Sequence, residues 1–190
     1  MLARGFKTRC ENISLQIRNE LGLGKTDPLP PKALAQYLGV LLWKPTDIPG
    51  LSQQTLTVLL EKGKIFWSAV TISYGRVDAI IYNSSHSKAR QASDIMHELS
   101  HMLLGHTPSQ IVLSPNNPFA LRSYNENQEE EAAWLAGCLL LPRKALVFIK
   151  NKGISDYKAC EIYEVSRKLL SYRVNVTGVN YQIQAKEHWS

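Results

Sequence analysis

The stretch from Asp94 to His106, DIMHELSHMLLGH, holds the residues whose types and spacing could do chemistry. His97 and His101 are four residues apart, so on a helix both imidazoles would lie on one face and could bind a divalent metal ion. Zn²⁺ lowers the pKa of a bound water toward neutrality, and a carboxylate beside it can take the proton of that water. With Glu98 between the two histidines, the HExxH pattern predicts metal-assisted amide hydrolysis with Glu98 as general base.

The setting of this pattern has to support it, because five residues alone are a short signal. Ile95, Leu99, Met102 and Leu103 recur at helical spacing on the side roughly opposite the histidines. One face would pack in a core while the other faces a cleft. The alternative is a surface helix that carries two histidines without a function.

The helix that presents the histidines is expected over about residues 86–104. Asn83 and the two serines after it form a polar turn, so Ser84 or Ser85 could cap its amino end. Gly105 is placed to end the helix in a left-handed conformation.

Two β-branched and aromatic segments precede this helix, at residues 65–74 and 76–82, and Gly75 separates them. They predict an antiparallel strand pair that borders the cleft. A strand edge of this kind could bind an extended substrate through main-chain hydrogen bonds. The pair could equally serve packing alone.

Other elements frame this centre. An amphipathic helix is expected over residues 4–21, a short helix over 31–38, a strand over 40–43 and a further short helix over 51–60. Residues 107–123 contain three prolines and lack periodicity, which predicts a loop that could act as a lid.

A second helix is predicted over residues 126–141, ENQEEEAAWLAGCLLL, with Pro142 closing it. Its first turn is acidic, as the helix dipole favours. The small residues Ala132, Ala133, Ala136 and Gly137 would let it approach another helix closely.

A catalytic zinc site usually has three protein ligands and one open position. His106 does not fit the pattern HExxHxxGxxH, because Leu104 and Thr107 stand where glycine and histidine are required. It could instead cap the helix, support a ligand or contact substrate. The other candidates are Glu129, Glu130 and Glu131; dipole reasons account for the first two, whereas Glu131 begins an apolar stripe that would face the core.

These pieces, in this order, resemble the ImmA/IrrE family of metallo-endopeptidases. Asn83 and Arg90 lead into HELSH, and EAAWLAGCLLLP, from Glu131 to Pro142, is similar to the family's second segment. The resemblance spans roughly residues 65–175. It implies that His97, His101 and Glu131 bind one catalytic Zn²⁺ ion, and that Glu98 activates the water.

The resemblance also implies a fold and a substrate class. The fold class would be α+β: a zincin-like core with a small antiparallel or mixed sheet packed on the two helices, spanning residues 1–150 with the N-terminal helices. Residues 151–190 would form a helical appendage packed on it. Family members typically cleave helix-turn-helix repressors of mobile elements or stress regulons, so a protein substrate of that type is expected.

Composition bounds the setting. The 190 residues are 44% hydrophobic and 20% charged, which is ordinary for a globular chain, and the formal charge of +6 is scattered along the sequence. The three cysteines have no CxxC pairing, and no apolar run is long enough to cross a bilayer. A reducing, cytoplasmic location without membrane contact is expected.

Two rival functions stay open. Residues 156–175 predict two short helices around Glu164-Val165-Ser166, an outline like a helix-turn-helix, with Arg167, Lys168 and Arg173 on its second helix. A DNA-binding regulator is therefore one rival, although scaffold use of this helix pair is favoured over direct DNA binding. A non-proteolytic anti-repressor or antitoxin-like module is the other. The presence of Glu98 argues against it, because binding a metal or a partner does not need this carboxylate. Tyr124, Tyr172 and His106 are candidates for contacting the substrate or its transition state.

Overall fold

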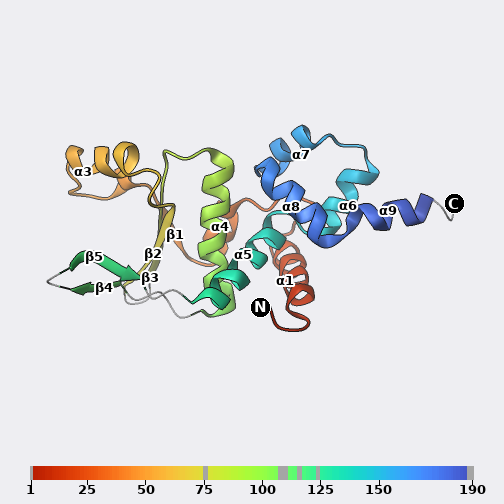
Figure 1. Cartoon of the computed structure of the whole chain (residues 1–190), viewed down its shortest axis with the longest axis horizontal. Coiled ribbons are helices and arrows are strands. Elements are labelled where there is room, and N and C mark those ends of the chain that lie inside the picture. Colours follow the sequence, from red (N-terminus) through yellow and green to blue (C-terminus); the bar gives the residue numbers. More distant parts are fainter. Residues whose placement is uncertain (1, 75–76, 107–110, 115–116, 123–124, 188–190) are drawn as a thin grey trace.

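In the computed structural model, the elements are arranged around one central helix, α4 (Lys88–Leu104). Figure 1 shows a small sheet on one side of α4, and α5 (Glu126–Leu140) and the carboxyl-terminal helices on the other. The structure describes residues 2–74, 77–106, 111–114, 117–122 and 125–187. The predicted α+β class is confirmed, with both motif helices at the expected places.

The sheet next to α4 has three strands in the order β1-β3-β2. β1 (Leu41–Trp43) runs parallel to β3 (Val77–Tyr82), and β2 (Ala69–Tyr74) runs antiparallel to β3. The predicted antiparallel pair is confirmed, although its first strand begins at Ala69 and not at residue 65. β2 is an outer strand of this sheet, on the opposite side of β3 from β1.

The amino-terminal helix α1 (Phe6–Glu20) buries one side. Its residues Phe6, Cys10, Ser14 and Ile17 are buried at three- and four-residue steps, which explains the predicted amphipathic pattern. This helix packs on α5. The elements that follow it are α2 (Pro31–Tyr37), η1 (Pro45–Asp47), α3 (Gln53–Thr57) and the π-helical turn η2 (Val58–Lys62).

A β-hairpin stands where the sequence predicted only a loop. Within residues 107–123, β4 (Ile111–Ser114) pairs antiparallel with β5 (Asn117–Arg122). The pairing register shifts between Val112 and Ser114, and Pro118 lies within β5. Prolines and an irregular register both obscure the alternation by which strands are recognised. A role of this segment as a lid stays a prediction.

As far as residue 187, the carboxyl-terminal part consists of four helices. They are α6 (Arg143–Asn151), α7 (Asp156–Tyr163), α8 (Arg167–Thr177) and α9 (Val179–Glu187). The predicted helix pair around Glu164-Val165-Ser166 is confirmed, and Ser166 caps α8 by accepting a hydrogen bond from the amide of Leu169. α6, which the sequence did not predict, packs on α8 and α9.

One apolar core runs from Phe6 to Val179, through both of the predicted parts. The division at residue 150 stays a prediction. Among the described residues, no single helix is long and apolar enough to cross a membrane, although α5 and α6 together pass that test across a 41° bend.

Buried guanidinium groups hold the carboxyl end of α5. The last carbonyl groups of a helix lack partners within it and carry its negative dipole end. Arg18 donates a 2.7 Å hydrogen bond to the carbonyl oxygen of Leu139, and Arg173 donates one of 3.1 Å to that of Leu141. Arg173 also pairs with Glu11 at 2.6 Å. Helices α1 and α8 are thereby fixed to the carboxyl end of α5.

Candidate metal centre

The HExxH helix begins at Lys88, two residues later than predicted. Its cap is Ser87, whose hydroxyl oxygen accepts a hydrogen bond from the amide of Arg90 at 3.4 Å. The prediction that Ser84 or Ser85 caps the helix is therefore wrong. The amide and hydroxyl of Ser85 instead donate to the side-chain oxygen of Asn83, which stabilises the turn before the helix.

The three groups that come together at this centre are His97 and His101 from α4 and Glu129 from the first turn of α5. His97 Nε2 lies 3.0 Å from Glu129 Oε2 and 3.1 Å from His101 Nε2. His101 Nε2 lies 3.5 Å from Glu129 Oε1. The predicted histidine pair therefore faces one point, and a carboxylate from a second helix faces it too.

These spacings fit a zinc ion. Ligand atoms at about 2.0–2.1 Å from a tetrahedral Zn²⁺ ion lie about 3.3 Å from one another. The three separations, 3.0, 3.1 and 3.5 Å, bracket this value, with the first and the last running to different oxygens of the Glu129 carboxylate. Two imidazoles and one carboxylate also form a donor set typical of catalytic zinc, which keeps a fourth position open for water or substrate. The residues present therefore fit the ion.

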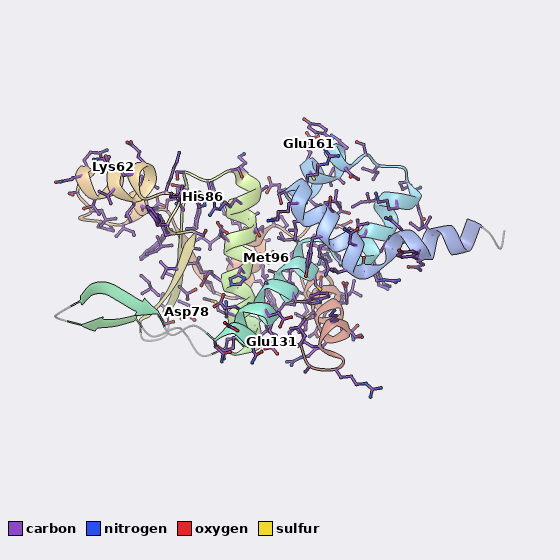
Figure 2. All side chains as sticks on the ribbon, viewed as in Figure 1. Lys62, Asp78, His86, Met96, Glu131 and Glu161 are labelled. Carbon is purple, nitrogen blue, oxygen red and sulfur yellow. The ribbon has the colours of Figure 1, made fainter. Side chains whose placement is uncertain are left out.

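Glu131, the third ligand that the sequence favoured, lies elsewhere. Its Oε2 is 3.1 Å from His106 Nε2, whereas the carboxylate near the histidine pair is that of Glu129. Figure 2 shows Glu131 at the amino end of α5, where this helix crosses α4. The structure thus differs from the sequence-based choice, and a metal-binding role of Glu131 stays a prediction.

The reason lies in how α5 is buried. Its second half is buried on nearly all sides, so several apolar stripes could each have marked the face toward α4. Glu129 shares a face with Ala132 and Ala136, which are 0% and 5% exposed. That helical spacing was the available signal for Glu129, but its place in an acidic first turn made a dipole role equally reasonable.

His106 lies against His101. The side chain of His106 is only 6% exposed, and its Nδ1 is 2.9 Å from the Nδ1 of His101. Gly105 has φ 67°, so the predicted left-handed end of α4 is confirmed. His106 thus contacts His101 on the ring edge away from Glu129, and its predicted contact with substrate stays a prediction.

Glu98 is buried and bound to the sheet. Its residue exposure is 6%, and the hydroxyl of Thr71 donates a 2.5 Å hydrogen bond to its Oε2. Thr71 belongs to β2, so an outer strand of the sheet reaches the carboxylate of the HExxH pattern. This contact had no signal in the sequence, because Thr71 pairs with a residue 27 positions later.

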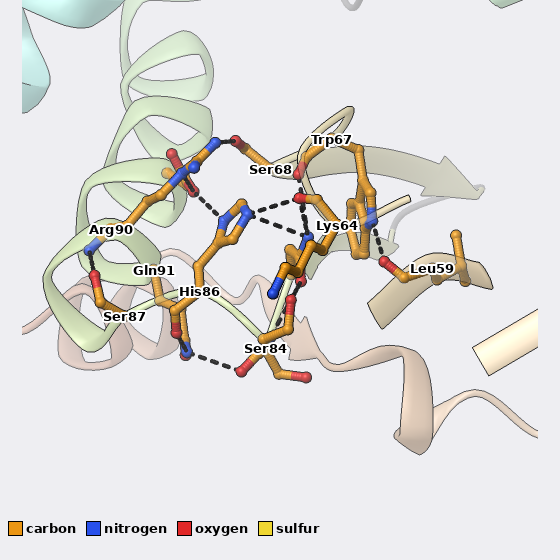
Figure 3. A network of polar contacts seen from close by, with 12 residues as sticks. Leu59, Lys64, Trp67, Ser68, Ser84, His86, Ser87, Arg90 and Gln91 are labelled. Atoms are coloured by element: carbon orange, nitrogen blue, oxygen red, sulfur yellow. Dashed lines mark hydrogen bonds and ion pairs between the residues drawn. The ribbon is translucent and has the colours of Figure 1, made fainter. Parts of the chain in front are cut away.

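A polar network fixes the start of β2 against α4 (Figure 3). His86 Nε2 donates to the carbonyl oxygen of Lys64 at 2.8 Å, and its Nδ1 lies 3.4 Å from Asp94 Oδ2. Arg90 donates to the hydroxyl of Ser68 at 3.1 Å. The segment that leads into β2 is therefore tied to the first two turns of α4, which places Thr71 beside Glu98.

The two tyrosine candidates have different outcomes. Tyr172, on α8, lines a pocket of about 450 Å³ that His97 also lines. Its ring packs edge-on against that of Trp134, with 6.4 Å between the ring centroids. Tyr124 lies outside the described residues. Contact of either side chain with a substrate stays a prediction.

The basic residues of the predicted recognition helix do not share one surface. Arg167 and Lys168 are exposed, but Arg173 is 1% exposed and paired with Glu11. A buried, paired guanidinium is not available to a phosphate backbone. Arg173 therefore has a structural place in this helix pair.

Two histidines and a carboxylate around one point, with the HExxH glutamate buried beside them, define a metallopeptidase-type hydrolase. Residues 62–175 match the Peptidase_M78 family, described as the IrrE N-terminal-like domain, and the chain belongs to this family. The predicted membership is thus confirmed, with close to the expected span. A comparison with curated proteins finds no match.

Proposed function

We propose that the protein is a zinc-dependent endopeptidase in which His97, His101 and Glu129 hold the ion. The observation that carries this proposal is the convergence of two imidazole Nε2 atoms and the carboxylate of Glu129, at separations of 3.0, 3.1 and 3.5 Å, next to a buried glutamate. When bound, the ion supplies Lewis-acid polarisation of the peptide carbonyl and a more acidic water. Membership in a metallopeptidase family supports the same conclusion.

Glu98 moves the proton in this proposal. Its carboxylate accepts a proton from the attacking water and delivers it to the leaving amide nitrogen, as a general base and then a general acid. The hydrogen bond from Thr71 occupies Oε2, so the carboxylate is held in one orientation. Burial keeps this group out of bulk water, where a competing hydrogen bond would misplace it.

The substrate we propose is an extended segment of a helix-turn-helix repressor of a mobile element or stress regulon. The repressor class comes from the family resemblance. Support for an extended segment comes from β2, which is an outer strand next to Glu98 and can offer main-chain groups to a peptide. A strand added there would bring its peptide bonds past the carboxylate.

The test is incubation of the purified protein with candidate repressors encoded beside its gene, with and without a chelator. We expect site-specific cleavage that chelation abolishes and that zinc restores. Mass spectrometry of the fragments identifies the scissile bond. If repressors are inactivated without any new amino terminus, the peptidase proposal fails.

The same experiment separates the non-proteolytic alternatives. An anti-repressor or antitoxin-like module would inactivate its partner equally well as the wild type and as Glu98→Gln, since binding does not need this carboxylate. A DNA-binding regulator would bind operator DNA at physiological salt without a partner. The burial of Arg173 weighs against this second alternative.

A further inference from the structure

Three side chains form a connected chain that ends at the candidate metal centre. Glu131 Oε2 lies 3.1 Å from His106 Nε2, and His106 Nδ1 lies 2.9 Å from His101 Nδ1. The side chain of His106 is 6% exposed and that of Glu131 is 29% exposed. A carboxylate at the protein surface is thus connected through a buried imidazole to one of the two histidines of the HExxH pattern.

The end of α4 builds this contact. The amide of Gly105 donates to the carbonyl oxygen of Met102, and that of His106 donates to the carbonyl oxygen of His101, both at 3.0 Å. This pair of bonds around a left-handed glycine is the Schellman motif, which brings the residue after the glycine against the residue five positions earlier. In this chain those two residues are His106 and His101, so the sequence H-x-x-x-G-H encodes their contact.

The hydrogen-bond pattern determines which nitrogen carries each proton. His101 Nε2 faces His97 and Glu129, so it can serve as a metal ligand only if its lone pair is free and Nδ1 carries the proton. His106 Nδ1 must then accept that proton's hydrogen bond. The proton of His106 is left on Nε2, where the carboxylate of Glu131 accepts it.

The opposite arrangement is unfavourable. If His106 Nδ1 donated to His101, the proton of a neutral His101 would move to Nε2, where it blocks metal binding. It would also leave His106 Nε2 without a proton against a carboxylate, so two acceptors would face each other. The anionic end of the chain therefore selects the tautomer of His101 that binds a metal.

We propose that Glu131 and His106 are positioning residues that fix the tautomer and ring orientation of His101 as a metal ligand. Outer partners of this kind orient ligating histidines and raise their basicity. The inference rests on the proposed metal site of His97, His101 and Glu129. It assigns Glu131 a place one residue removed from His101 and not a place among the ligands.

The experiment measures zinc affinity of the full chain by competition with a chelating dye. His106→Phe keeps a planar ring but removes both nitrogens, and we expect it to weaken affinity about 10–100-fold. His106→Asn, whose side-chain oxygen can accept from His101 Nδ1, should restore most of this loss. Glu131→Gln should weaken affinity less than His106→Phe does, and the matched control Glu130→Gln should leave it unchanged.

A second readout follows the protons directly. In the metal-free wild type, long-range ¹H–¹⁵N NMR of the imidazoles should find the proton of His101 on Nδ1. In His106→Phe and Glu131→Gln, a larger fraction of His101 side chains than in the wild type should carry the proton on Nε2. A merely structural role of His106 would leave this distribution unchanged.

The outcomes separate this inference from the proposed function. If the wild type fails to bind zinc, both fail. If the wild type binds zinc and His106→Phe binds it equally well, the positioning role of His106 and Glu131 is wrong, while the proposed metal site is still supported. If Glu131→Gln loses as much zinc affinity as Glu129→Gln while His106→Phe loses none, Glu131 is itself a ligand and its positioning role is excluded.

Discussion

Thr71 on β2 donates a 2.5 Å hydrogen bond to Glu98 on α4, so the sheet and the HExxH helix meet at the carboxylate itself. Thr71→Val keeps the shape of the side chain and removes the donor. We expect kcat to fall about tenfold, because a hydrogen bond to a charged group contributes about 1.5 kcal/mol to its placement. Zinc affinity should not change.

The measurement for Thr71→Val is the rate of repressor cleavage at saturating substrate, with zinc content determined alongside. Ser73→Ala is the matched control, since Ser73 lies two residues further on the same face of β2 and is exposed. Equal rates in Thr71→Val and the wild type would show that this hydrogen bond does not place the carboxylate.

Glu98→Gln should separate chemistry from metal binding. The amide is nearly isosteric but cannot accept the proton of the attacking water, so we expect cleavage to fall about 10²–10⁴-fold. Zinc affinity and repressor binding should persist because Glu98 is not among the three groups that face the metal point. Fragment yield and dialysis-equilibrated zinc content measure the two effects, and loss of zinc in this variant would contradict the assigned role.

Glu129→Gln should reduce zinc affinity more than any change in the Glu131–His106 pair. A direct ligand is expected to contribute more than the roughly 10–100-fold that outer partners contribute. Chelator competition with Glu129→Gln, Glu131→Gln and Glu130→Gln side by side measures the order of the three neighbouring carboxylates. An order in which Glu130 or Glu131 ranked first would exclude Glu129 as the third ligand.

Glu11→Ala should destabilise the fold, since it leaves the guanidinium of Arg173, which is 1% exposed, without its ion-pair partner. Removing one member of a buried pair costs about 3–5 kcal/mol. Urea unfolding measures this loss. Glu161→Gln, which breaks the exposed pair with Lys158, is the control and should leave the free energy of unfolding nearly unchanged.

Asp94 should make stability depend on pH. Burial raises the pKa of the Asp94 carboxyl above its ordinary value, against the opposing effect of His86 and Arg90. The folded chain then holds this proton more tightly than the unfolded chain does. The resulting stabilisation is present below the ordinary carboxyl pKa and is lost as pH rises through that value to the raised folded one.

Asp94→Asn removes this titration. We expect the free energy of unfolding of the metal-free wild type, minus that of the variant, to decrease between about pH 3 and pH 7. Urea unfolding at a series of pH values provides the comparison. A difference that grows with pH would show that the ion pairs of Asp94 outweigh its burial.

Local patterns in the sequence were sufficient for much of the fold. The helical spacing of apolar residues predicted α1, α4 and α5, and Gly105 predicted the left-handed end of α4. β-branched runs predicted the antiparallel pair β2 and β3. These signals succeed because helix periodicity, capping and strand alternation act over a few neighbouring residues.

The hairpin β4–β5 and helix α6 were not predicted, each for its own reason. An irregular register and internal proline weaken the local pattern of the hairpin, and α6 directly follows the Pro142 that closes α5. The strands β4 and β5 pair with each other, so the hairpin was local but its pattern was irregular. The surfaces on which α6 packs belong to α8 and α9, which come later in the chain, so no short window of sequence contains that packing.

The sequence by itself determined the chemistry: two histidines four apart on a helix, a glutamate between them, and an acidic helix later in the chain. Only the tertiary structure decided that Glu129 faces the histidines, that Glu131 faces His106, and that Thr71 holds Glu98. The HExxH pentapeptide can be interpreted from sequence because its residues are spaced along one helix. The choice among three successive glutamates depends on how α5 is rotated against α4, and successive residues differ by about 100° around a helix, so packing across the whole interface sets it.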